Sequence, residues 1–157
     1  MVMNNHQPEF EEVIITSFEA LENIYQRYIN NNNVNTIFES FNWIKTWYCQ
    51  YWQSNWQLHC IVYTQNKSII AIAPFYINRS NSFPYLTALH FIGQGEPEEA
   101  EVSSEYVDIQ IKAGYEQYIY PLVANQLNNS SFDLFNVKAV LTDSHITKIL
   151  PRLNGRA

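Results

Sequence analysis

The sequence from Phe38 to Trp56, FESFNWIKTWYCQYWQSNW, contains all four tryptophans of the chain. At the helical period its large apolar residues fall on one broad face and its polar residues on the other. The apolar face consists of Trp43, Ile44, Trp47, Tyr48, Tyr51 and Trp52. Ser40 is well placed to cap this helix through its hydroxyl. Burial of each large side chain contributes about 1.5–3 kcal/mol, so we expect the helix to be the hub of the core, with Trp43 and Trp47 buried against a sheet.

The composition is that of one folded domain. The chain has 157 residues, of which 46% are apolar and 15% charged, and a net charge of −6. The basic residues are scattered, whereas nucleic-acid binding requires a basic patch, so nucleic acid is not expected as a partner. No apolar run approaches the ~20 residues that span a membrane, and no signal peptide is visible, which predicts a cytoplasmic protein. Cys49 and Cys60 are expected to be free thiols.

The segments on either side of the tryptophan-rich helix predict a sheet with helices. Val13–Thr16 has the pattern of a short strand, and the following helix should run to the Asn30–Asn33 run, which suits a helix end. Gln57–Thr64 and Ser68–Asn78 predict a β-hairpin that is apolar on both faces, so we expect helices on both sides of the sheet. Pro74 lacks a ladder donor, which predicts an edge position or a bulge.

The second half of the chain predicts three more strands and two helices. In order they are a strand Tyr85–Ile92, an acidic solvated loop Glu96–Glu105, a strand Tyr106–Ile111, a helix Tyr115–Asn128, a strand Phe132–Val137 and a short helix ending at Leu150. Pro121 should kink the first of these helices or break its first turns. Asp143 is expected to cap the second. The four histidines are widely spaced and no metal-binding pattern is present, so no metal is expected.

Four short segments resemble the CelD-like acetyltransferases, a branch of the GNAT fold that is related to the Fem-type aminoacyl transferases. They are Phe38-x-Ser40-x-x-Trp43-x-x-x-Trp47, Ile72-Ala73-Pro74-Phe75, Leu89-His90-Phe91-Ile92-Gly93 and Ser104-Glu105-Tyr106-Val107-Asp108. The resemblance covers about residues 13–150. It implies an α/β (α+β) fold for the single domain 1–157, with a mixed, mostly antiparallel twisted sheet and helices on both faces.

The resemblance also implies an acyl-CoA-dependent N-acyltransferase. Members of the family are about twice this length and carry two GNAT-like halves, of which this sequence matches the first. In GNAT enzymes the cofactor pyrophosphate rests on backbone N–H groups of a Gly-rich turn between a strand and a helix. The corresponding residues here are Lys112, Gly114 and Tyr115, with one glycine in the turn. The implied cofactor is acetyl-CoA or another acyl-CoA.

Acyl transfer to an amine needs a base for the amine and an acid for the thiolate. Glu105 as base and Tyr106 as acid are the pair that the sequence offers, and Asp108 lies on the same strand face as Tyr106 if the strand is regular. The structural alternative is a solvated Glu105, with Tyr106 and Asp108 hydrogen-bonded near the end of a sheet.

A function of another class also fits the sequence, namely a non-catalytic binding or self-assembly module. Few charges interrupt the aromatic and aliphatic residues between Ile69 and Ile92. A large apolar patch is rarely left bare on a monomer, and two-fold pairing is the commonest oligomer symmetry. We therefore expect either a homodimer, with Phe132–Val137 as the contact, or a missing second GNAT half as the partner.

Overall fold

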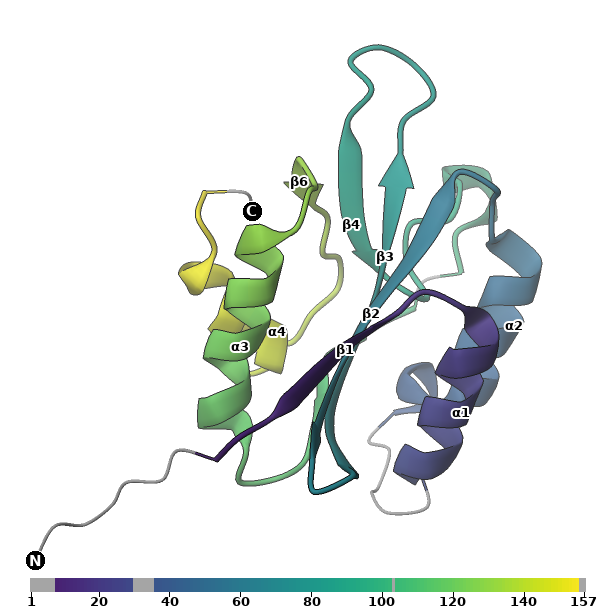
Figure 1. Ribbon diagram of the computed structural model, residues 1–157. Coiled ribbons are helices and arrows are strands. Elements are labelled where there is room, and N and C mark those ends of the chain that lie inside the picture. Colours follow the sequence, from purple (N-terminus) through teal and green to yellow (C-terminus); the bar gives the residue numbers. More distant parts are fainter. Residues whose placement is uncertain (1–7, 30–35, 103, 156–157) are drawn as a thin grey trace, which may run out of the picture.

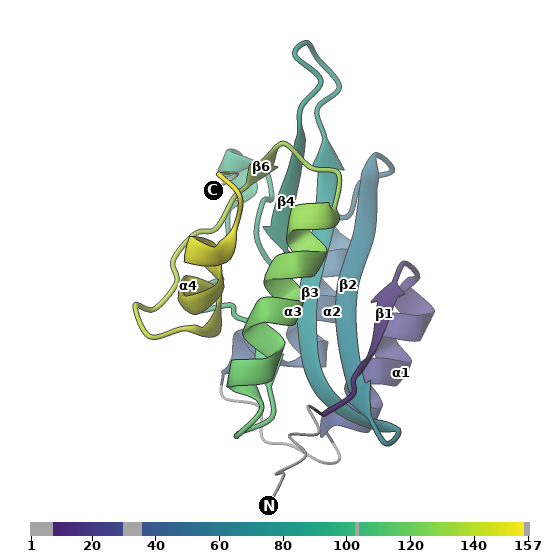
Figure 2. The same ribbon diagram turned by 60° about the vertical axis from the view of Figure 1, so that its left-hand side comes forward.

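The computed structural model describes residues 8–29, 36–102 and 104–155. Within these residues, a mostly antiparallel sheet has helices on both faces (Figures 1 and 2). The strands are β1 (Glu11–Ile15), β2 (Trp56–Gln65), β3 (Ser68–Arg79), β4 (Thr87–Phe91), β5 (Gln110–Ile111) and β6 (Leu134–Phe135). The helices are α1 (Phe18–Ile29), α2 (Phe41–Tyr51), α3 (Glu116–Asn129) and α4 (His145–Ile149), with 3₁₀ turns η1 (Ile37–Glu39), η2 (Glu98–Ala100) and η3 (Leu150–Arg152). The predicted α+β class is therefore confirmed.

The strand order is β1-β2-β3-β4-β6, and β5 pairs with β3. All pairs are antiparallel except β4 with β6. Helices α1 and α2 cover one face and α3 and α4 the other (Figure 1). Each face holds its own hydrophobic cluster, so β2 and β3 are apolar on both sides as predicted.

The predicted start of the tryptophan-rich helix is confirmed. The Ser40 hydroxyl accepts a hydrogen bond from the Trp43 backbone N–H at 3.3 Å. Trp47 is 2% exposed and stacks on Trp56 at 5.7 Å between ring centroids. Trp43 is only half-buried, because its indole extends toward the pocket described below. The Asn30–Asn33 run lies outside the described residues.

The predicted hairpin is confirmed, and it joins β2 to β3 through a tight turn. Gln65 pairs with Ser68, and the two residues between them have positive φ angles of 49° and 65°. On β2, Leu58, Cys60 and Val62 belong to the cluster under α1 and α2, whereas Ile61 and Tyr63 belong to the cluster under α3. The period-2 pattern therefore assigned these side chains to the correct faces.

The prediction of an edge position or a bulge at Pro74 is wrong. Pro74 lies in β3, a central strand, and the irregularity of the hairpin is at Tyr63 and Thr64. The Pro74 carbonyl accepts from the Ile92 N–H at 2.8 Å. In an antiparallel ladder the N–H and C=O of one residue point to the same neighbour. The Pro74 nitrogen therefore faces Ile92, the residue that follows β4, and the β3–β4 ladder ends at this position.

Three predicted strands are shorter than expected. The segments Tyr85–Ile92, Tyr106–Ile111 and Phe132–Val137 contain strands of only five, two and two residues. Tyr106 has a φ of +60°, which no regular strand adopts. Val107 and Ile109 are nevertheless buried. Alternation of apolar residues in the sequence thus predicts which side chains are buried. It does not predict which backbone groups form the hydrogen bonds of a strand ladder.

Two predictions about the last helices require comment. Pro121 does not break α3, which runs through it from Glu116 to Asn129, and Pro121 is exposed to solvent. The second prediction is wrong. Asp143 does not cap α4. Instead the Asp108 carboxylate accepts from the backbone N–H groups of His145 at 2.6 Å and Ile146 at 2.9 Å. A carboxylate from a distant segment thus satisfies the N–H groups that open α4.

Candidate functional site

A pocket of about 130 Å³ opens beyond the carboxyl end of β4. Residues from three separate segments line it, and most of them are polar. These residues are Gln94, Gly95, Glu96, Glu101, Ser104, Glu105, Lys138 and Ala139. The strand partners of β3 change at this point, because β4 pairs with one half of β3 and β5 with the other. The pocket therefore lies at a gap in the sheet.

Side chains from the core reach this pocket through their polar atoms. The Trp43 indole donates to the Ser104 hydroxyl at 3.1 Å, and the Trp47 indole donates to the Glu96 carboxylate at 3.0 Å. The Tyr76 hydroxyl donates to the Gln94 carbonyl at 2.6 Å. The aromatic cluster under α2 thus lies behind the pocket and is hydrogen-bonded to three of its lining residues.

The Gln94 side chain holds two walls of the pocket together. Its amide nitrogen donates to the carbonyl oxygens of Ser104 at 3.3 Å and Lys138 at 2.8 Å. Its amide oxygen accepts from the Lys138 backbone N–H at 3.4 Å. Because all these groups are paired, the burial of Gln94 costs little and the three segments are fixed relative to one another.

Glu96 was predicted to lie in a solvated loop, and this prediction is wrong for that residue. Its side chain is buried. One carboxylate oxygen accepts from the Trp47 indole and the other from the Val102 backbone N–H at 2.9 Å. A buried carboxylate is tolerated only when it is hydrogen-bonded, and these two donors satisfy it.

Gly95 brings the backbone directly onto two aromatic rings. Its φ is +90°, and a Cβ atom at this position would lie against the Tyr76 hydroxyl and 2.8 Å from Nδ1 of His90. His90 stacks on Tyr76 at 5.2 Å between ring centroids. Burial, with a smaller effect of Lys138, lowers the pKa of His90 to about 4, and burial raises the pKa of Tyr76. His90 is therefore neutral at pH 7.

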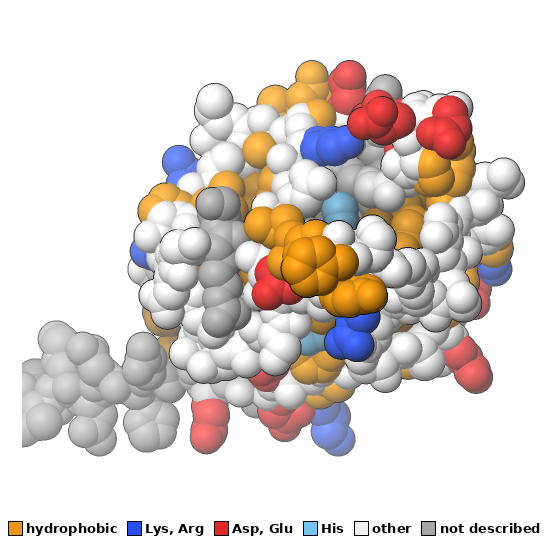
Figure 3. Space-filling view, turned by 90° about the horizontal axis from the view of Figure 1, so that it is seen from above, with side chains coloured by type: hydrophobic (Ala, Val, Ile, Leu, Met, Phe, Trp, Pro, Cys, Tyr) orange, Lys and Arg blue, Asp and Glu red, His pale blue; other side chains and the backbone are white. Residues whose placement is uncertain are grey.

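The mouth of the pocket is charged. The Lys138 ammonium lies 3.7 Å from the Glu101 carboxylate, and both side chains are about half exposed. Glu105 is exposed at the same mouth. Seen from above, acidic side chains gather along one margin of this end of the molecule (Figure 3). With Glu96, the pocket lining contains three carboxylates and one ammonium, and this excess of negative charge favours a positively charged group such as a primary amine.

Of the predicted catalytic residues, only Glu105 lines the pocket. Tyr106 is 43% exposed, and its backbone N–H donates to the Ala139 carbonyl at 2.9 Å, which fixes it to the pocket wall. Asp108 caps α4 through both carboxylate oxygens. Burial raises the pKa of Asp108, and the hydrogen bonds from the α4 backbone oppose this rise. The structure thus places Glu105 at the pocket and Asp108 beneath α4.

The predicted cofactor residues lie together at the far end of β5. The backbone N–H of Lys112 donates to Ile70, and the Tyr115 hydroxyl donates to Gln65 at 3.1 Å beside the β2–β3 turn. Gly114 has a φ of +90°, and its N–H donates to the Glu116 carboxylate at 2.9 Å. A pyrophosphate would meet this carboxylate, so the turn as arranged does not fit the cofactor phosphate.

Several residues of the pocket, and of the layer behind it, were not predicted as site residues from the sequence. Gln94, Glu96, Ser104 and Lys138 line the pocket, and Trp43, Trp47, Tyr76 and His90 lie behind these residues. The segment Gly93-Gln94-Gly95, which follows a strand, was the one sequence signal of a special backbone conformation at this pocket. Both glycines indeed adopt positive φ. The indole N–H groups of the buried tryptophans also require acceptors, but the sequence does not indicate which residues supply them.

Within the described ranges 8–29, 36–102 and 104–155, no group of three or more His, Cys, Asp or Glu side chains is arranged to hold a metal ion. None of the helices in these ranges has the length and apolar character needed to cross a membrane.

The chain was also compared with known proteins. Neither the family models, nor the curated proteins, nor the solved structures gave a match.

Proposed function

We propose that this chain is a GNAT-like domain of acyltransferase descent, and that the pocket at the end of β4 binds the amine that accepts the acyl group. One observation carries the proposal. The segments that resemble the CelD-like acetyltransferases are far apart in the sequence, and residues of three of the four meet at this pocket. Trp43 and Trp47 hydrogen-bond to its lining residues, His90 packs against Gly95, and Ser104 and Glu105 line it.

The charges of the pocket support an amine as the ligand. Glu96 is buried and fully hydrogen-bonded, so it supplies a fixed negative charge. Glu105 is exposed at the mouth, where it is accessible to a proton from an incoming amine. In this proposal Glu105 is the base, Tyr106 is its neighbour on the pocket wall and the proposed acid, and Asp108 is structural.

The turn at Lys112, Gly114 and Tyr115 holds its own carboxylate, Glu116, where the phosphate of acetyl-CoA or another acyl-CoA would bind. We therefore propose that a second GNAT-like half supplies the donor site, and that this domain contributes the acceptor pocket.

An NMR titration tests the acceptor pocket. Addition of a small primary amine such as butylamine should shift the Trp43 indole and Gln94 side-chain signals. Glu105→Gln should weaken the response, whereas Glu116→Gln, at the other end of β5, should leave it unchanged. Equal responses in both variants, or none in the wild type, would contradict an amine pocket.

A thermal shift with acetyl-CoA tests the donor site. We expect little stabilisation of the wild type, because a ligand stabilises the folded state only when its concentration exceeds its dissociation constant. If the turn is the phosphate site, Glu116→Gln should restore a measurable shift. Strong binding by the wild type would instead make this chain the donor-binding half.

A self-assembly module is the second candidate function, and exposed apolar side chains favour it. Leu134, on the edge strand β6 in the predicted contact Phe132–Val137, is 51% exposed. Large aromatic residues are also exposed on the loop between β3 and β4. Light scattering over a dilution series tests this candidate, because a mass of one chain at every concentration would exclude it.

A further inference from the structure

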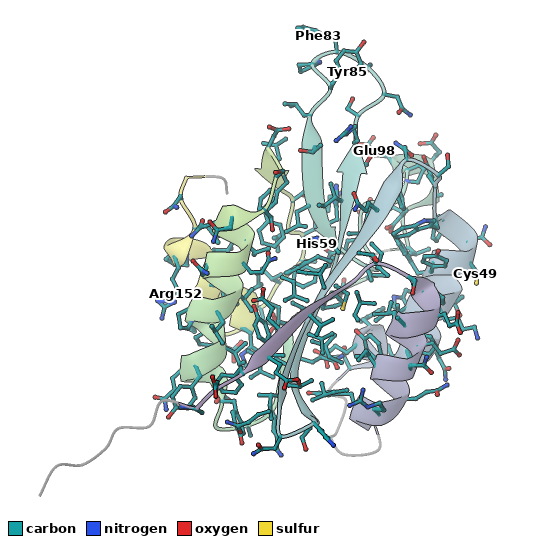
Figure 4. The ribbon with its side chains drawn as sticks, in the orientation of Figure 1. Cys49, His59, Phe83, Tyr85, Glu98 and Arg152 are labelled. Atoms are coloured by element: carbon teal, nitrogen blue, oxygen red, sulfur yellow. The ribbon has the colours of Figure 1, made fainter. Side chains whose placement is uncertain are left out.

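The loop that joins β3 to β4 projects beyond the rest of the molecule (Figures 1 and 2). From Ser80 to Leu86 it carries no charged residue. Phe83 is 85% exposed and Tyr85 is 64% exposed, and both lie at its outermost end (Figure 4). We call Phe83, Pro84 and Tyr85 the aromatic tip. Clustered aromatic side chains that are held in solvent are typical of an interaction surface.

Hydrogen bonds within the loop hold the aromatic tip in place. The Ser80 N–H donates to the Leu86 carbonyl at 2.8 Å, and the Tyr85 N–H donates to the Ser82 carbonyl at 2.8 Å. The rings of Phe83 and Tyr85 meet edge to face at 6.2 Å between centroids. Because the tip is already ordered, a contact through it loses little conformational entropy.

An apolar groove of about 780 Å³ lies at the other end of the molecule. It runs between the residues that precede β1 and the first half of α3. Its apolar lining consists of Pro8, Phe10, Tyr118, Pro121 and Leu122. The rings of Phe10 and Tyr118 lie 6.1 Å apart and form an aromatic floor. The groove therefore matches the aromatic tip in chemical character.

We propose that the aromatic tip of one copy of this chain inserts into the groove of the next copy. The charges beside the two surfaces are complementary. Arg79 is exposed at the base of the tip, and Glu9 is exposed on the rim of the groove. Opposite charges around an apolar contact favour the encounter and set its orientation.

The positions of the two surfaces determine the kind of assembly. The tip and the groove lie at opposite ends of the molecule (Figures 1 and 2). The tip projects away from the body of the molecule, so the copy that receives it lies beyond this end and not alongside. Each copy offers one tip and one groove, so the contact is heterologous and continues head to tail. This inference rests on the self-assembly candidate and is independent of the amine pocket.

The experiment uses two variants of the full chain, each of which keeps one of the two surfaces. The tip variant combines Phe83→Ser with Tyr85→Asn, because Asn tolerates the positive φ of residue 85. The groove variant combines Gln117→Arg with Asn125→Arg, two exposed groove residues on α3 whose replacement leaves the core intact. Asn129→Arg, exposed on α3 outside the groove, is the matched control.

Light scattering at increasing protein concentration gives the readout, and circular dichroism checks that each variant is folded. We expect the mass of the wild type and of the control to rise beyond two chains. Each variant alone should keep the mass of one chain. An equimolar mixture of the two should double that mass and stop there, because only one tip and one groove remain to pair.

Three results would overturn the inference. A wild type with the mass of one chain at all concentrations would remove both the contact and the self-assembly candidate. Association that stops at two chains and persists in the groove variant would indicate a two-fold contact, through the tips or through β6, and would leave self-assembly intact. A mixture that stays at the mass of one chain would show that the tip and the groove do not bind each other.

Discussion

The two faces of the sheet are built from different kinds of side chain. Under α1 and α2 the core contains aromatic residues with polar atoms, such as Trp47 and Tyr76, whose indole and hydroxyl groups reach the pocket. Under α3 and α4 most core residues, such as Phe75, Phe91 and Leu127, have no polar side-chain atoms, with Tyr63 as an exception. Side chains such as Trp47 on the first face therefore contribute both to stability and to the site, whereas a residue such as Leu127 contributes to stability alone.

The largest effect is expected from a matched pair of core substitutions, one on each face of the sheet. Trp47→Ala should lower the free energy of unfolding by about 3–5 kcal/mol and Leu127→Ala by about 2–5 kcal/mol. Chemical denaturation measures both changes. Only the first should also disturb the pocket, because it removes the donor to Glu96. The indole N–H signal of Trp43 should therefore shift in Trp47→Ala and not in Leu127→Ala. A shift in both variants would contradict the division between the faces.

A comparison of alanine substitutions at two glycines distinguishes the cost of backbone strain from the cost of steric crowding at the pocket. Gly95 and Gly114 both have a φ of +90°, but a Cβ at Gly114 would meet nothing within 4 Å. Gly114→Ala should cost about 1–2 kcal/mol for the left-handed backbone alone. Gly95→Ala should cost roughly 2–5 kcal/mol, because Tyr76 and His90 must also move. Thermal unfolding of the two variants measures the difference, and equal costs would show that the close packing at Gly95 is unimportant.

The pH dependence of stability compares a histidine from each face. The pKa of His90 is about 4 in the folded chain, below its ordinary value of 6.5. Between these values the unfolded chain binds a proton that the folded chain does not. Stability therefore falls as the pH is lowered from about 6.5 toward 4, by up to about 3 kcal/mol.

Burial also lowers the pKa of His59 on the other face, but Gln126 and Glu12 oppose this effect. The sign of its pH dependence is the same, and we expect a smaller slope. The free energy of unfolding, measured by denaturation at several pH values between 4 and 7, should therefore depend less on pH in both variants. The reduction should be larger in His90→Phe than in His59→Phe. The reverse order would mean that the face with the pocket is the better hydrated of the two.

The smallest expected effect concerns the ion pair at the mouth of the pocket. Lys138 and Glu101 are both about half exposed and 3.7 Å apart. Exposed pairs contribute at most about 1 kcal/mol, so Lys138→Gln should change the free energy of unfolding by less than that. It should also raise the pKa of His90, which Lys138 lowers, and NMR titration of the imidazole measures this change. A loss of several kcal/mol would make Lys138 part of the structural core.

The sequence predicted features that depend on residues close together in the chain. The cap at Ser40, the buried face of α2 and the β2–β3 turn each involve neighbours within a few positions. Local propensity and side-chain periodicity determine such features.

The features that the sequence did not predict depend on partners far along the chain. The donor that permits the burial of Glu96 is Trp47, 49 positions away, and the cap of α4 is Asp108, 37 positions from His145. For the same reason, Glu105 was predicted as a site residue but the rest of the pocket was not. No periodicity encodes which distant segment supplies a hydrogen bond.

The tight turn between β2 and β3 has a consequence for the order in which the chain folds. These two strands pair along their length across a connection of two residues, so closing their ladder costs very little loop entropy. β5 and β6 join the sheet only after much longer segments have been closed. The β2–β3 ladder should therefore form early, and its amide protons should exchange with solvent more slowly than those of β5 and β6.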